Sequence, residues 1–188
     1  MNKVKKFILA ITGASGACYA KRLFDVLKER SELHVVISER GVELLKLELD
    51  LKTSYFSGKN VTLYKNSKIN TCIASGSFRT DGMIVVPASM GTVGRIASGV
   101  SATMVERAAD VILKEKRKLI IVPRETPFST IHLQNLLTLD RAGAHILPAS
   151  PGFYSGQKSF EDLVDFVVAR ILDQLDVDQD LMAPYQGR

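Results

Sequence analysis

The chain has 188 residues, 46% of them hydrophobic and 24% charged, and carries a net charge of +5 at pH 7. This length fits one domain over residues 1–188, with enough apolar side chains to form a full core. The apolar run that begins at Phe7 is too short for a secretory signal. No stretch approaches the ~20 apolar residues that cross a bilayer, so we expect no membrane span.

The excess of basic over acidic residues fits either an ordinary basic surface or a pocket for a phosphorylated ligand. The densest basic run, at 114–118, is interrupted by Glu115 and leads into an apolar segment. We therefore expect no nucleic-acid binding. The two cysteines, Cys18 and Cys72, do not have the spacing of metal ligands, and the three histidines do not have it either. We expect no metal, reduced cysteines and a cytoplasmic location.

Short apolar runs alternate with helical patterns along the chain. The runs that we predict as strands are 7–11, 33–37, 83–86, 119–122 and 144–147. Helical periodicity is present in 17–28, 41–49, 104–113, 131–139 and 160–175. Periodicity is weak in 50–70, which we predict to be irregular. Uniformly apolar strands separated by helices indicate an α/β fold, a Rossmann-like, doubly wound and mostly parallel sheet flanked by helices.

Small residues at 12–16 connect the first strand to the first helix. Backbone N–H groups at the positive end of a helix suit a phosphate. The loop is neither a complete dinucleotide fingerprint nor a Walker loop, so a simple tight turn also remains open. The second strand ends at Ser38 before Glu39, so NAD is possible but weakly supported.

Two further strand ends carry polar side chains. Residues 87–92 repeat the order of strand, small residues and helix, and Ser89 and Thr92 could donate to a phosphate or simply cap the helix. Arg124 and Glu125 follow a later strand, where they could grip a phosphate and position a proton, or form a surface ion pair.

Other charged and aromatic positions are also candidates. Arg107 and Lys114 lie two turns apart on one helix face. They could bind an anion together, or they could be ordinary solvated charges. Tyr154 follows a rigid Pro-Gly turn, where it could reach a ligand or join the core. Arg170 lies near the apolar stripe of the last helix, where it could pair with an anion or extend to solvent.

In order and spacing, these stretches resemble the UbiX-type flavin prenyltransferase family, formerly described as aromatic-acid decarboxylases. The matching stretches are TGASG at 12–16, ERAADV at 106–111, LKE at 113–115, VPRETP at 122–127, HL at 132–133, PGFY at 151–154 and DLVDF at 162–166. The resemblance covers nearly the whole chain. It implies a single-domain flavoprotein that joins the dimethylallyl group of dimethylallyl phosphate to N5 and C6 of reduced FMN, without a metal.

The resemblance also implies partners and site residues. The prenylated FMN would serve a UbiD-type decarboxylase, and the chain would form a homo-oligomer, a dodecamer by family. The residues expected to contact FMN are Gly13, Ala14, Ser15, Ser38, Ser89, Met90, Gly91, Thr92 and Arg124. Those expected to act in catalysis are Ser15, Glu48, Glu125, Lys114 and Tyr154, with Glu48 entering from a neighbouring subunit. Those expected to bind the prenyl phosphate are Arg107, Lys114, Tyr154 and Arg170.

One departure and three alternatives accompany this interpretation. Pro184-Tyr185 stands where the family usually has Arg-Trp, so an arginine contact is missing. A flavin-dependent decarboxylase could act on an aromatic acid or on a peptidyl cysteine. The cysteine class is expected to carry a Pro-x-Met-Asn signature, and residues 87–90 lack its asparagine. A non-catalytic FMN carrier is the third alternative.

Overall fold

The structure is a computed structural model that describes residues 4–154 and 156–183. Its strands are β1 Lys5–Ile11, β2 Ser31–Ile37, β3 Val61–Lys65, β4 Gly82–Ala88, β5 Lys118–Pro123 and β6 His145–Ile146. They form one sheet in the order β3-β2-β1-β4-β5-β6, and every pair is parallel. The α/β prediction is confirmed.

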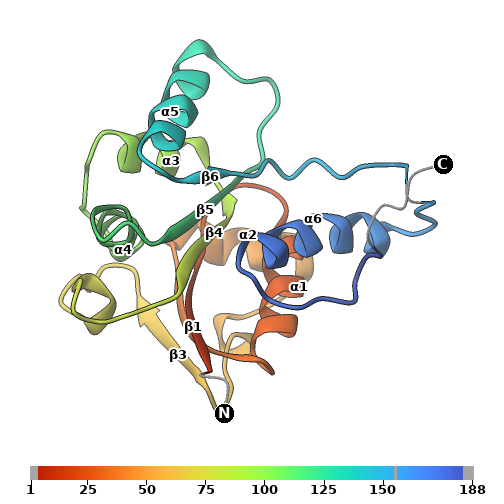
Figure 1. Cartoon of the computed structure of the whole chain (residues 1–188), viewed down its shortest axis with the longest axis horizontal. Coiled ribbons are helices and arrows are strands. Elements are labelled where there is room, and N and C mark those ends of the chain that lie inside the picture. The colour runs from red at the N-terminus through yellow and green to blue at the C-terminus, as the bar shows by residue number, and fades with distance from the viewer. Residues whose placement is uncertain (1–3, 155, 184–188) are drawn as a thin grey trace.

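Helices cover both faces of this sheet (Figure 1). They are α1 Ala17–Leu27, α2 Glu39–Leu49, α3 Met90–Ala97, α4 Met104–Lys114, α5 Thr130–Arg141 and α6 Phe160–Gln174. Serine is the N-cap residue of α2, α3, α5 and α6. Its hydroxyl accepts a backbone N–H that the helix leaves unpaired, which explains why these helices begin where they do.

Alternating strand residues divide the core into two layers. On β1, Phe7, Leu9 and Ile11 pack with α1, α2 and α6, whereas Ile8 and Ala10 pack with α3, α4 and α5. Both layers are apolar because successive strand side chains point to opposite faces. Figure 1 shows the same division, with α4 and α6 on opposite sides of the sheet.

The prediction that 50–70 is irregular was wrong, because β3 lies there. This strand forms the edge of the sheet, and Thr62, Leu63 and Lys65 are exposed. An exposed edge strand needs no continuous apolar run, so its sequence does not carry the signal of the buried strands. At the other edge, β6 is shorter than the predicted 144–147.

The strand order changes direction between β1 and β4, where ligands of this fold class bind beyond the carboxyl ends of the strands. Thr12, directly after β1, joins the two loops at this point. Its Oγ1 donates to the Pro87 carbonyl at 2.7 Å and accepts from the Ser89 N–H at 2.8 Å. Among the described residues, none of the helices has the length and apolar character needed to cross a membrane.

Candidate functional site

A pocket of about 210 Å³ lies at the carboxyl edge of the sheet, beside the switch point. It is lined by Gly13, Ser38, Glu39, Arg40, Asn66, Ser89, Thr92, Arg95, Thr103 and Val105. Of the residues that we expected to hold a cofactor, the structure brings four to this one pocket, namely Gly13, Ser38, Ser89 and Thr92. They come from loops that are far apart in the sequence.

The N-termini of α2, α3 and α4 meet at this pocket through their N-cap residues Ser38, Ser89 and Thr103. Ser38 Oγ accepts from the Gly41 N–H at 3.1 Å, and Ser89 Oγ accepts from the Thr92 N–H at 3.4 Å. Each helix contributes partial positive charge at its N-terminus. A phosphate placed here would therefore meet several positive helix ends and hydroxyl donors together.

Arg95 supplies a formal positive charge to this pocket, although none of the sequence motifs indicated it. Its Nε donates to the Glu106 carboxylate, and its Nη2 lies 3.3 Å from Thr92 Oγ1. Burial alone raises the pKa of Glu106, but hydrogen bonds from Arg95 and from the Thr103 backbone outweigh it and lower that pKa. The spacing from Thr92 to Arg95, one helical turn, was the signal that could have revealed this residue.

The loop at 13–16 lies beside the pocket and is tightly packed. A Cβ at Gly13 would overlap Cβ of Arg40, and Gly16 has a φ of 111°, so both positions require glycine. The Arg124 Nε donates to the Ser15 carbonyl at 3.1 Å. Arg124 is therefore held at this loop. Among the described residues it does not line the pocket, whereas Arg95 does.

Glu48 contacts the same loop from its own chain. Its carboxylate accepts the Gly16 N–H at 2.9 Å and the Ala17 N–H at 2.8 Å. We expect Glu48 to enter the site of a neighbouring subunit, and that role stays a prediction beside this contact within its own chain. The last turn of α2 already brings its carboxylate to the N-terminus of α1, where a negative charge is favourable.

The remaining FMN candidates lie along the same edge. Ala14 and Met90 are buried, whereas Ser15 and Gly91 are exposed. Glu125 is partly exposed beside Arg124, and its Oε1 accepts from the Thr126 N–H at 3.0 Å. All of these residues follow β1, β4 or β5.

Tyr154 and Arg170 lie near α6, in a separate cluster. The Tyr154 ring contacts Phe166 edge-on with 5.8 Å between ring centroids, and Tyr154 is 59% exposed. Arg170 follows Phe166 by four residues and therefore lies on the same face of α6. Its guanidinium pairs with Asp173. Both residues belong to the layer that contains α1 and α2.

Arg107 and Lys114 lie on the other side of the sheet, on α4. Helix α4 begins at the pocket and runs away from it, so Lys114 lies about 16 Å farther along the axis. Arg107 donates to the Ala74 carbonyl and pairs with Asp110, and Lys114 pairs with Glu115. Within one chain these residues therefore lie across the sheet from Tyr154 and Arg170, and the expectation that all four bind one prenyl phosphate stays a prediction. Helical spacing places residues on one helix face, but it does not identify the layer that the helix joins.

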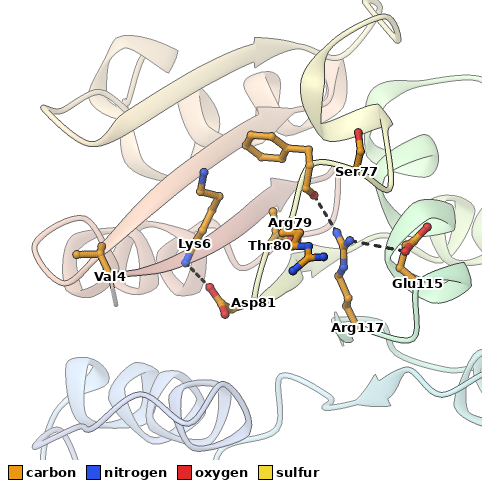
Figure 2. Close-up of a pocket in the computed structure, with 9 residues that line it drawn as sticks. Val4, Lys6, Ser77, Arg79, Thr80, Asp81, Glu115 and Arg117 are labelled. Carbon is orange, nitrogen blue, oxygen red and sulfur yellow. Dashed lines mark hydrogen bonds and ion pairs between the residues drawn. The ribbon is translucent and has the colours of Figure 1, made fainter. Parts of the chain in front are cut away.

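A larger pocket, of about 640 Å³, lies at the opposite, amino edge of the sheet (Figure 2). The Lys6 N–H donates to Asp81 at 2.7 Å, and Arg117 donates to the Phe78 carbonyl at 2.9 Å. These contacts join the starts of strands and the turns before them. Since ligands of this fold class bind at the carboxyl ends, we place the functional site in the smaller pocket.

The residues described by the structure contain no group of three or more histidine, cysteine or acidic side chains that could hold a metal. Pro184-Tyr185 lies outside the described residues.

Taken together, the doubly wound sheet and the pocket at its switch point define a Rossmann-like protein with a site for a phosphorylated ligand. The Flavoprotein family model matches residues 1–172. A flavin prenyltransferase UbiX of Methanocaldococcus jannaschii is 46% identical over 176 residues, covering 94% of this chain and 96% of that protein.

Two solved structures are similar over almost their whole length. The structure of AnUbiX in complex with FMN and dimethylallyl pyrophosphate gives a TM-score of 0.96 at 40% identity, covering 99% of this chain and 100% of that one. A dodecameric FMN-dependent UbiX-like decarboxylase of Escherichia coli O157:H7 gives 0.93 at 41% identity, covering 97% and 100%. This chain belongs to the UbiX-type flavin prenyltransferase family.

Proposed function

We propose that this protein transfers the dimethylallyl group of dimethylallyl phosphate to reduced FMN, and that residues 1–188 form one FMN-binding domain. The observation that carries the proposal is the pocket where the N-termini of α2, α3 and α4 meet, in a chain of this family. Its hydroxyls, helix ends and arginine suit the phosphate monoester of FMN.

In this proposal the loop at 13–16 lies along the flavin ring, while Ser38, Ser89 and Thr92 hold the phosphate arm. Arg124 fixes the loop through the Ser15 carbonyl. Reduced FMN supplies an electron-rich N5 and C6 as the acceptor atoms. Ser15, Met90 and Gly91 then border the place where the prenyl group arrives.

Donors must stabilise the phosphate that leaves when the allylic C–O bond breaks, because it takes the bonding electron pair with it. Tyr154 and Arg170 supply a hydroxyl and a guanidinium from one cluster. We propose that Arg107 and Lys114 come from a neighbouring subunit, since they lie across the sheet from that cluster. A dodecameric relative supports assembly of this kind.

Two carboxylates are placed to move protons during ring closure. Glu125 follows β5 beside Arg124, and Glu48 contacts the Gly16 and Ala17 N–H groups. After the bond to N5 has formed, ring closure requires a proton on the prenyl double bond, attack of C6 on the resulting cation and loss of the C6 proton, and either carboxylate could carry these protons. Ser15 directly precedes the Gly16 N–H that Glu48 contacts, and its carbonyl accepts from Arg124, the neighbour of Glu125 in the chain.

A direct assay tests the proposal. The protein is incubated without oxygen with reduced FMN and dimethylallyl phosphate, and in parallel with the pyrophosphate. We expect a flavin heavier by one prenyl unit and release of inorganic phosphate from the monophosphate. Failure to form this flavin, under conditions in which the M. jannaschii relative forms it, would contradict the proposal.

A flavin-dependent decarboxylase is a second candidate, because the E. coli O157:H7 relative is described as one. Release of CO2 from an aromatic acid or a peptidyl cysteine by the purified protein alone would favour it. A non-catalytic FMN carrier would bind FMN but form no prenylated flavin.

We further propose a UbiD-type decarboxylase as recipient of the product. We also propose a cytoplasmic location, which the two free cysteines support.

A further inference from the structure

The phosphate pocket contains a cation that the family motifs do not identify. Arg95 lies in the last turn of α3, and its side chain is 50% exposed where it lines the pocket. An ideal Cβ at Gly91 would lie 3.5 Å from Arg95 Nη1, so the guanidinium extends back over the first turn of α3. That turn provides the N–H groups of the pocket.

Arg95 is held in this position by a buried carboxylate. Glu106 is only 1% exposed and accepts the Ala102 N–H at 3.0 Å and the Thr103 N–H at 2.9 Å, so the start of α4 fixes it. Its Oε1 accepts from Arg95 Nε. A buried carboxylate is costly unless it is paired, so this contact fixes the guanidinium as well.

The guanidinium keeps donor capacity after these contacts. Nε bonds to Glu106 and Nη2 contacts Thr92, whereas Nη1 makes no hydrogen bond within the described part of the chain. Of the other charges of the lining, Arg40 pairs with the exposed Glu43, and Glu39 accepts from Asn66 within the lining itself. Arg95 is thus the lining cation directed at the capped helix ends.

We infer that Arg95, positioned by Glu106, recognises the phosphate of the flavin and makes this chain prefer FMN to riboflavin. The inference rests on the proposed function, because it takes FMN to be the ligand. Arginine matches a phosphate through two parallel N–H donors, and hydrogen bonds to charged groups are stronger than neutral ones. Arg95 therefore adds to the neutral donors Ser38, Ser89 and Thr92.

The test compares the affinity of the full-length protein for oxidised FMN and for riboflavin, by quenching of flavin fluorescence. We expect Arg95→Gln to weaken FMN binding about 10- to 100-fold and to leave riboflavin binding within about twofold. The FMN-to-riboflavin ratio should fall by the same factor. Raised salt should weaken FMN binding less in the variant than in the unchanged protein.

Two further variants keep the test decisive. Arg22→Gln is the matched control, because Arg22 is also a helical arginine paired with a carboxylate, Asp165, and should leave the ratio unchanged. If Arg95→Gln fails to fold because Glu106 is left unpaired, Arg95→Gln with Glu106→Gln removes both charges and should show the same loss.

The outcomes separate the inference from the proposed function. If the unchanged protein prefers FMN and the Arg95 variants keep that preference, Arg95 does not recognise the phosphate and the inference is wrong. If the unchanged protein does not bind FMN, the proposed function itself fails. Equal weakening of FMN and riboflavin would also overturn the inference, because it would indicate a general loss of structure.

Discussion

At the scale of single residues, the site separates into side chains that bind the phosphate and side chains near the reacting atoms. Ser38 and Ser89 cap helices and line the pocket, so each of them acts both in folding and in binding, and Thr92 lines the pocket beside Ser89. Ser15 is different. It is exposed in the loop after β1, and within the described part of the chain only its carbonyl is held, by Arg124.

This difference leads to a prediction for Ser15→Ala. The substitution removes a hydroxyl but leaves the backbone and the phosphate pocket intact. We expect the rate of prenyl transfer to fall about 10- to 100-fold, as for loss of one positioned donor or proton-transfer group. The dissociation constant of FMN should change less than about threefold. Single-turnover kinetics and flavin titration measure the two quantities separately.

Ser89→Ala provides the matched comparison, because Ser89 lies in the pocket lining and caps α3. It should weaken FMN binding more than it slows the chemical step. The reverse pattern in the two variants would place Ser15 at the phosphate and remove it from the reacting edge.

At the scale of elements, most of the fold could be predicted from the sequence, because buried parallel strands are continuous apolar runs. The runs at 7–11, 33–37 and 83–86 all lie within observed strands. The exposed edge strand β3 could not be found in this way. The pairing of Arg95 with Glu106 was missed for another reason, because it joins α3 to α4 and no local pattern encodes it.

The start of α1 illustrates such a contact between elements and leads to a prediction. Its N-cap residue Gly16 has no side chain, and Glu48 of α2 accepts the Gly16 and Ala17 N–H groups in its place. We expect Glu48→Ala to lower the free energy of unfolding by about 1 kcal/mol, as for loss of a capping side chain. Glu48→Gln keeps an acceptor and should lower it less. Urea denaturation followed by circular dichroism measures both.

Glu43→Ala is the control for this prediction, since Glu43 also lies on α2 but makes only an exposed pair with Arg40. Such a pair contributes little to stability. If Glu48→Ala were no more destabilising than Glu43→Ala, the contact would not hold the start of α1, and any loss of activity would reflect chemistry alone.

At the scale of the whole molecule, the proposed prenyl-phosphate residues are divided between the two layers of the fold. Tyr154 and Arg170 lie with α6, and Arg107 and Lys114 lie on α4 across the sheet. The sequence placed all four in one site because its motifs carry no information about which chain supplies them. If all four bind one prenyl phosphate, as we propose, the two layers require a second chain, and a symmetric assembly can bring the two groups together.

Mixed assemblies test this arrangement. Lys114→Ala and Tyr154→Phe should each be nearly inactive alone. When the two variants are co-expressed and assemble at random, about one quarter of the sites combine an intact Lys114 from one subunit with an intact Tyr154 from another. We therefore expect about a quarter of the activity of the unchanged protein, measured as prenylated flavin formed per site.

Tyr154→Phe mixed with Arg170→Ala is the control, because both residues come from one subunit and no intact site can form. If the first mixture stays inactive while mixed assemblies are confirmed by mass spectrometry, Lys114 and Tyr154 do not share a site between subunits.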